Sequence, residues 1–98
     1  MKFTFKKYIA TGLYKSFELK HTDIKLGGLE VGAIDQQKDS YKYKISFAIK
    51  KERTIKEPAP FKWISLKVRF ETEKEARVFI KRHEIEIQEK YDLYQFED

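Results

Sequence analysis

The stretch YKYKISFAIK, residues 41–50, alternates apolar and polar side chains at every second position. Side chains of a β-strand point in turn to the two faces of a sheet, so this pattern predicts a strand with one buried face. The apolar positions are Tyr41, Tyr43, Ile45, Phe47 and Ile49, and the polar ones include Lys42, Lys44, Ser46 and Lys50. The same period continues in FKWISLKVRF, residues 61–70, with Ile64, Leu66, Val68 and Phe70 on one face and Trp63, Ser65, Lys67 and Arg69 on the other.

After Phe70 the period changes to that of a helix. Thr72-Glu73-Lys74-Glu75 is a capping box, in which the Thr72 hydroxyl accepts a hydrogen bond from the Glu75 amide. Helical spacing of the apolar residues that follow predicts a helix from Glu73 to about His83. Beyond it, Ile87 and Tyr91 would continue the helical stripe, whereas residues 84–87 alternate like a strand. We favour a helix that ends near residues 83–84 and an extended segment around residues 91–96.

The N-terminal part of the chain predicts further strands. Alternation in residues 3–9 places Phe3, Phe5 and Ile9 on one face, and a second pattern follows at Leu13, Phe17 and Leu19. Gly27-Gly28 between short apolar runs predicts a hairpin, and the prolines of residues 51–60 predict a loop. We therefore expect one α+β domain over residues 1–98. Its antiparallel sheet has about five or six strands and is packed on one face by one main helix near residues 73–83.

Composition excludes several kinds of site. The chain has no cysteine, which rules out disulfides and thiolate chemistry, and it has no apolar run long enough to cross a membrane. His21 and Asp23 offer only two metal ligands, no serine lies in a nucleophile motif, and Gly27-Gly28 lacks the pattern of a phosphate-binding loop. We expect a cytoplasmic protein that is not an enzyme, with no catalytic residue, cofactor or metal.

Charge is unevenly distributed along the chain. Residues 1–83 have a net charge of +10, whereas residues 84–98 have a net charge of −5 and form an acidic C-terminal tail. This asymmetry suggests an anionic partner for the basic body, or a tail that neutralises it. The alternative is that the lysines serve solubility alone.

Basic side chains gather on the polar face of the two best-defined strands. If residues 41–50 and 61–70 pair, a set of cations surrounds Trp63, namely Lys42, Lys44, Lys50, Lys67 and Arg69. Cations attract phosphates, and an indole offers a surface on which bases stack, so this face is suited to nucleic acid. The alternative is the ordinary polar outer face of a one-sided sheet.

A family resemblance accompanies this pattern. A strand and a polar turn are followed by YKYKISFAIKK, a further strand and FETEKEARVFIK, so that residues 29–83 resemble the arm-type DNA-binding domain of tyrosine recombinases. The match to the family's F-x-T-x-x-E-A helix start consists of Phe70, Thr72, Glu75 and Ala76. The resemblance implies a three-stranded sheet backed by one helix, with the sheet inserted into the major groove. It would make Lys42, Lys44, Lys67 and Arg69 the DNA-facing residues.

We therefore expect a small nucleic-acid-binding accessory protein, of the kind that a phage or mobile element encodes, which uses the basic outer face of its sheet. The alternative is a protein-interaction module, an inhibitor or adaptor that binds its partner through a sheet edge or an aromatic surface. Neither the type of nucleic acid nor the oligomeric state follows from the sequence.

Overall fold

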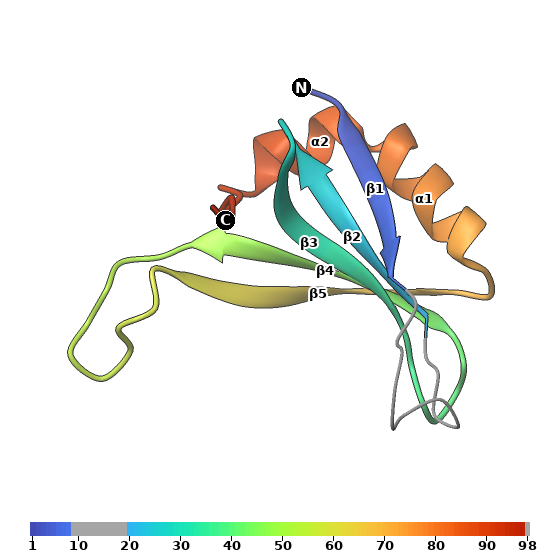
Figure 1. The fold of residues 1–98 in the computed structure, drawn as a ribbon, viewed down its shortest axis with the longest axis horizontal. Coiled ribbons are helices and arrows are strands. Elements are labelled where there is room, and N and C mark those ends of the chain that lie inside the picture. Colours follow the sequence, from blue (N-terminus) through green and yellow to red (C-terminus); the bar gives the residue numbers. More distant parts are fainter. Residues whose placement is uncertain (9–19, 98) are drawn as a thin grey trace.

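The computed structural model describes residues 1–8 and 20–97, so the expected positions Ile9, Leu13, Phe17 and Leu19 lie outside the described residues. Five antiparallel strands form one twisted sheet with two helices on one face, which confirms the predicted α+β class (Figure 1). The strands pair in chain order and are β1 (Phe3–Tyr8), β2 (His21–Leu26), β3 (Leu29–Gln36), β4 (Tyr43–Lys50) and β5 (Phe61–Phe70). The helices are α1 (Glu73–Arg82) and α2 (Glu84–Lys90).

The backbone conformation of a few residues determines where the strands turn. Gly27 and Gly28 have φ angles of 62° and 82°, the left-handed conformation that a tight hairpin requires, so the hairpin prediction is confirmed. The prediction that β4 begins at Tyr41 is wrong, because the strand begins at Tyr43. Tyr41 has a φ of 57°, and its amide donates to the Gln37 carbonyl, so the chain is still turning there.

Buried side chains from the sheet and the helices form one core. It contains Phe3, Ile24, Val31, Ile34, Ile45, Phe47, Ala76, Ile80 and Ile87, among others. Val68 was expected on this face but is 46% exposed. β5 lies at the edge of the sheet, and its register against β4 shifts between Lys44 and Ser46, so the strand is irregular where Val68 lies and the simple alternation of faces does not hold there.

The helices confirm the predicted N-cap at Thr72 and show which conformation the residues after α1 adopt. The Thr72 hydroxyl accepts a hydrogen bond from the Glu75 amide at 3.1 Å, as predicted for the N-cap of α1. Residues 84–87, which alternate like a strand, form part of α2 (Glu84–Lys90) instead. In this helix Ile87 is buried against the sheet, whereas Ile85 is 71% exposed. In the described residues, no helix is long and apolar enough to span a membrane.

Side chains from the helices cover the edge of the sheet at β1. The Phe3 amide donates to the Glu84 carboxylate at 2.7 Å, and the Lys81 ammonium donates to the Phe3 carbonyl at 3.0 Å. Gln88 reaches the carbonyl of Met1 at 2.6 Å. The helices therefore satisfy backbone groups that an open strand edge would leave free.

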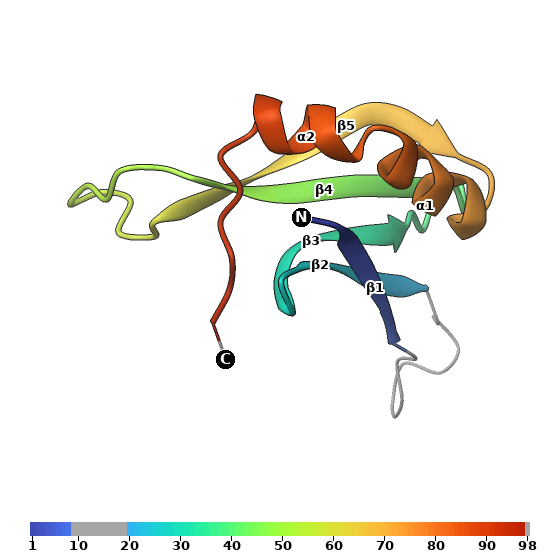
Figure 2. The ribbon, with the colours of Figure 1, turned by 90° about the horizontal axis from the view of Figure 1, so that it is seen from above.

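The segment after α2, residues 91–97, passes across the end of β4 towards the beginning of β3 (Figure 2). The Lys50 amide donates to the Asp92 carbonyl, and the Tyr94 amide donates to the Ala48 carbonyl, both at 2.8 Å. The Phe96 amide donates to the Glu30 carbonyl at 2.9 Å. This C-terminal segment therefore bridges β4 and β3, which confirms the expected extended segment and joins it to the sheet.

Candidate nucleic-acid interface

The face of the sheet opposite the helices, called here the outer face, is built from rows of side chains that run across the strands. In one row the register places Ala33 of β3 beside Ser46 of β4, and Ser46 beside Ser65 of β5. We call these three residues the small-residue row. The Ser46 and Ser65 hydroxyls lie 3.1 Å apart and hydrogen-bond to each other.

Larger side chains flank the small-residue row. On one side, the register aligns His21, Asp35, Lys44 and Arg69 from four successive strands. On the other side lies Trp63, which is paired with Ala48. The space between forms a hollow of about 300 Å³, and Glu30 also lines it. The hollow exists because three adjacent positions across the sheet have small side chains.

An aromatic cluster lies next to the hollow and joins β5 to the C-terminal segment. The Phe61 ring stacks on Tyr94 with centroids 4.9 Å apart, and it meets Phe96 edge-on at 4.7 Å. Phe96 also stacks on Trp63 at 5.6 Å, yet Trp63 remains 48% exposed. Trp63 was predicted from the sequence as a site residue, whereas Phe61, Tyr94 and Phe96 were not. The only signal in the sequence was the two-residue spacing of the aromatic pairs 61/63 and 94/96, which places both side chains of each pair on the same side of an extended segment.

His21 is held between two carboxylates. Its Nε2 lies 2.8 Å from Asp23, and its Nδ1 makes a short hydrogen bond to Asp35. Burial of the ring opposes a positive charge, but the hydrogen bonds to Asp35 and Asp23 outweigh it, so the pKa of His21 is raised above its ordinary value. Because carboxylates occupy both ring nitrogens, the ring is poorly placed to act as a general base.

The cluster of His21, Asp23 and Asp35 was also examined as a metal site. Among the residues that the structure describes, no group of three or more histidine, cysteine or carboxylate side chains could hold a metal ion. His21 and Asp23, the pair considered as metal ligands from the sequence, instead bind each other. Their arrangement is that of a structural ion pair at the end of the sheet.

The structure places five of the six predicted site residues in strands β4 and β5. Lys44 pairs directly with Arg69, Trp63 lies opposite Ala48, and Lys50 lies opposite Phe61, which puts these four residues on the outer face. Lys67 is exposed and lies in β5 where the register against β4 is irregular. Lys42 precedes β4 instead, and its ammonium lies 3.4 Å from the Glu71 carboxylate.

Two of these cations have further partners. The Lys50 ammonium lies 3.5 Å from the Asp92 carboxylate, and both side chains are mostly exposed. The Arg69 guanidinium donates to the Leu66 and Val68 carbonyls and, at 2.9 Å, to the Gln37 side chain. Arg69 therefore holds the irregular part of β5, a structural role that the sequence did not suggest.

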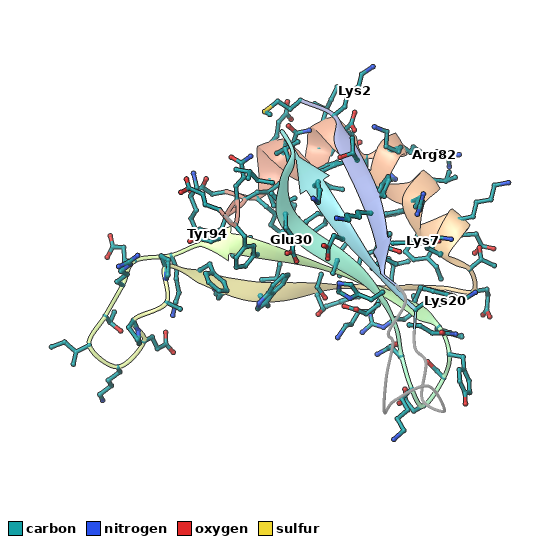
Figure 3. The ribbon with its side chains drawn as sticks, viewed as in Figure 1. Lys2, Lys7, Lys20, Glu30, Arg82 and Tyr94 are labelled. Atoms are coloured by element: carbon teal, nitrogen blue, oxygen red, sulfur yellow. The ribbon has the colours of Figure 1, made fainter. Side chains whose placement is uncertain are left out.

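Other basic residues lie on the β1 and α1 side of the molecule, including Lys2, Lys7, Lys20 and Arg82 (Figure 3). Here acidic partners are close: Lys7 lies 3.0 Å and Arg77 3.2 Å from the Glu73 carboxylate. Burial raises the pKa of Glu73, but hydrogen bonds from Thr22, Lys7 and Arg77 outweigh it, so the pKa is lowered overall. Lys7 and Arg77 therefore share one acidic partner within the fold.

Comparison with known proteins adds no relative. No protein-family model matches the chain, and no match was found among curated proteins or solved structures.

Proposed function

We propose that the protein binds nucleic acid through the ribbon formed by β4, β5 and their connecting loop. The observation that carries this proposal is the concentration of charge. Residues 42–69 contain nine Lys/Arg and two Asp/Glu, a net charge of +7, whereas the whole chain has a net charge of +5. The rest of the protein is therefore slightly acidic, and an anionic partner is attracted to the ribbon.

The shape of the ribbon supports the same function. Its loop end, residues 51–60, projects beyond the rest of the molecule (Figure 1). A two-stranded β-ribbon fits the major groove of DNA, and its cations release counterions from the phosphates. Residues 29–83 have the order β3, β4, β5, α1, the order that the resemblance to arm-type DNA-binding domains implies.

Ion pairs on the ribbon do not prevent this use of its cations. Lys42–Glu71 and Lys50–Asp92 join exposed side chains at 3.4 and 3.5 Å. Exposed pairs of this kind contribute about 0–1 kcal/mol each, less than a cation gains from a phosphate in a closely packed complex. Lysine side chains are long enough to exchange one partner for the other.

A second candidate is a protein partner that adds a strand to β5. The ten residues of β5 form an edge of the sheet, and both Val68 and Trp63 are about half exposed. Exposed edges pair readily with extended segments of other chains. Lys62, Lys67 and Arg69 of this strand act against such pairing, because charged side chains along an edge are a common protection from it. Nucleic acid therefore remains the first proposal.

Fluorescence anisotropy with labelled single- and double-stranded DNA and RNA, at about 50 and 200 mM salt, tests the proposal. The charge-reversal variant is Lys44→Glu with Lys67→Glu, which leaves the structural Arg69 intact. The matched control, Lys2→Glu with Lys74→Glu, changes the net charge equally at exposed positions outside the ribbon.

We expect the parent affinity to fall steeply with salt. Loss of two phosphate contacts should lower the slope of log K against log salt by roughly 2 on duplex DNA. The control should keep most of the affinity and the slope. Equal loss in both variants would mean that only net charge matters, and no binding at low salt would favour the protein-partner candidate.

A further inference from the structure

We propose that Ile55, in the loop at the end of the ribbon, enters duplex DNA between two neighbouring base pairs and bends the duplex. This inference rests on the proposed function and adds to it a strand type and a change in the shape of the bound DNA. It depends on the exposure of the Ile55 side chain, on the hydrogen bonds that order the turn around it and on the cations beside it.

The Ile55 side chain lies entirely in water. Its exposed fraction is 103%, the highest among the large apolar side chains that the structure describes. The loop that carries it, residues 51–60, projects beyond the helices and the other strands in both views (Figure 1, Figure 2). Removal of an isoleucine side chain from water releases free energy. Ile55 is therefore placed to enter a partner that the ribbon meets, and its burial there stabilises the complex.

Hydrogen bonds order the turn that presents Ile55. The Thr54 amide donates to the Glu57 carbonyl at 3.0 Å, and the Glu57 amide donates to the Thr54 hydroxyl at 2.9 Å. The Lys51 ammonium donates to the Glu57 carboxylate at 2.5 Å and lowers the pKa of that carboxyl below its ordinary value. The Pro-Ala-Pro sequence of residues 58–60 restricts the backbone further, because a proline ring fixes φ. Insertion of this ordered turn therefore costs less conformational entropy than insertion of a disordered loop.

Cations flank the isoleucine. Arg53 and Lys56 are exposed on either side of it, and no ion pair joins either of them to another of the residues that the structure describes. Cations at these positions can contact the phosphates next to an opened base step. A single exposed apolar residue is common on protein surfaces. The role assigned to Ile55 follows from its place between two cations on an ordered turn at the end of a basic ribbon.

Insertion of an apolar side chain bends a duplex because it separates two stacked base pairs on one side. The inserted side chain replaces part of the lost stacking, and the bend brings more of the DNA into contact with the protein. Unstacking still costs free energy, so insertion is easiest at a flexible step such as TA or at a mismatch. A duplex is required, since a single strand has no stacked base pairs to separate.

The test uses a duplex of about 20 base pairs with a TA step at its centre and a fluorescent donor and acceptor at its two ends. Binding of the parent protein should raise the energy transfer between the dyes, as expected for a bend of about 20–90°. A duplex with a central mismatch should bind about tenfold more tightly than the intact duplex, because part of the cost of unstacking has already been removed.

Variants of Ile55 separate insertion from attraction by charge. Ile55→Ser should abolish the bend and the preference for the mismatch, and it should keep the salt dependence of binding to the intact duplex because it removes no cation. Ile55→Leu, which keeps an apolar side chain of the same size, should keep the bend. The matched control is Ile85→Ser, the same change at a residue that is 71% exposed on α2, and it should bend the duplex as the parent does. Circular dichroism confirms that each variant is folded.

Binding of the parent to the duplex without a bend would overturn the inference and leave the proposed function intact. A bend that survives in Ile55→Ser, or that is lost equally in Ile85→Ser, would overturn it as well. Binding to single-stranded DNA or RNA but not to the duplex would have the same consequence. Failure to bind duplex DNA, single-stranded DNA and RNA at low salt would overturn the proposed function itself.

Discussion

Leu93 offers the most direct test of how the C-terminal segment is joined to the domain. This side chain is 8% exposed and belongs to the core, and the residue forms a bridge with Ile49 of β4. Leu93→Ala removes most of the buried side chain and leaves the backbone hydrogen bonds of Asp92 and Tyr94 in place. The variant therefore measures the packing alone.

Substitutions of buried leucine by alanine cost about 2–5 kcal/mol. Leu93 lies near the chain end, where neighbouring groups can move to fill the space, so we expect a cost of about 3 kcal/mol in the free energy of unfolding. For a domain of this size, 1 kcal/mol corresponds to about 4–8 °C, so the melting temperature should fall by roughly 15 °C.

Ile85→Ala is the matched control, because it also removes part of a large aliphatic side chain, from a residue that is 71% exposed on α2. Its effect should stay within about 0.5 kcal/mol. Thermal and urea unfolding followed by circular dichroism measure both variants. If Leu93→Ala is no more destabilising than Ile85→Ala, the segment does not pack as described, and its contribution to the core is refuted.

Two further predictions concern the helix start and the histidine. Thr72→Ala should lower the free energy of unfolding by about 1 kcal/mol, since it removes the N-cap of α1, and an unchanged urea midpoint would place the helix start elsewhere. The raised pKa of His21 means that the folded state binds its proton more tightly than the unfolded state. The stabilisation is therefore complete below the unfolded pKa of about 6.5 and is lost as the pH rises through the folded value. Urea midpoints at about pH 5.5 and 8.5 should differ less in Asp35→Asn than in the parent; an identical difference in both would show that Asp35 does not raise this pKa.

Strands with one buried face could be predicted from sequence because their pattern is local. Alternation in residues 43–50 and 61–70 indicates both the strand and its polar face, and the register of the two strands places Lys44 opposite Arg69 and Trp63 opposite Ala48. Residues 84–87 fit two periods equally well. Only the position of the sheet decides that Ile87 is buried and Ile85 exposed.

The hollow could not be predicted from the sequence, because it depends on the register of three neighbouring strands. Ala33, Ser46 and Ser65 are unremarkable one at a time, and only two consecutive strand pairings bring them together. For Arg69 too, only part of its role could be predicted from the sequence. Its charge could be predicted to lie on the outer face, whereas its bonds to the Leu66 and Val68 carbonyls arise from an irregularity in β5.

The pairing of strands in chain order has a consequence for folding kinetics. Each hairpin of the sheet closes a short loop, at a small cost in chain entropy, so the sheet can form by successive local steps. The bonds between β1 and the helices join residues about eighty positions apart, as in Phe3 with Glu84. We expect the contacts of α1 and α2 with β1 to form after the local hairpins, and amides that depend on them, such as that of Phe3, should exchange with solvent before those in the centre of β3 and β4.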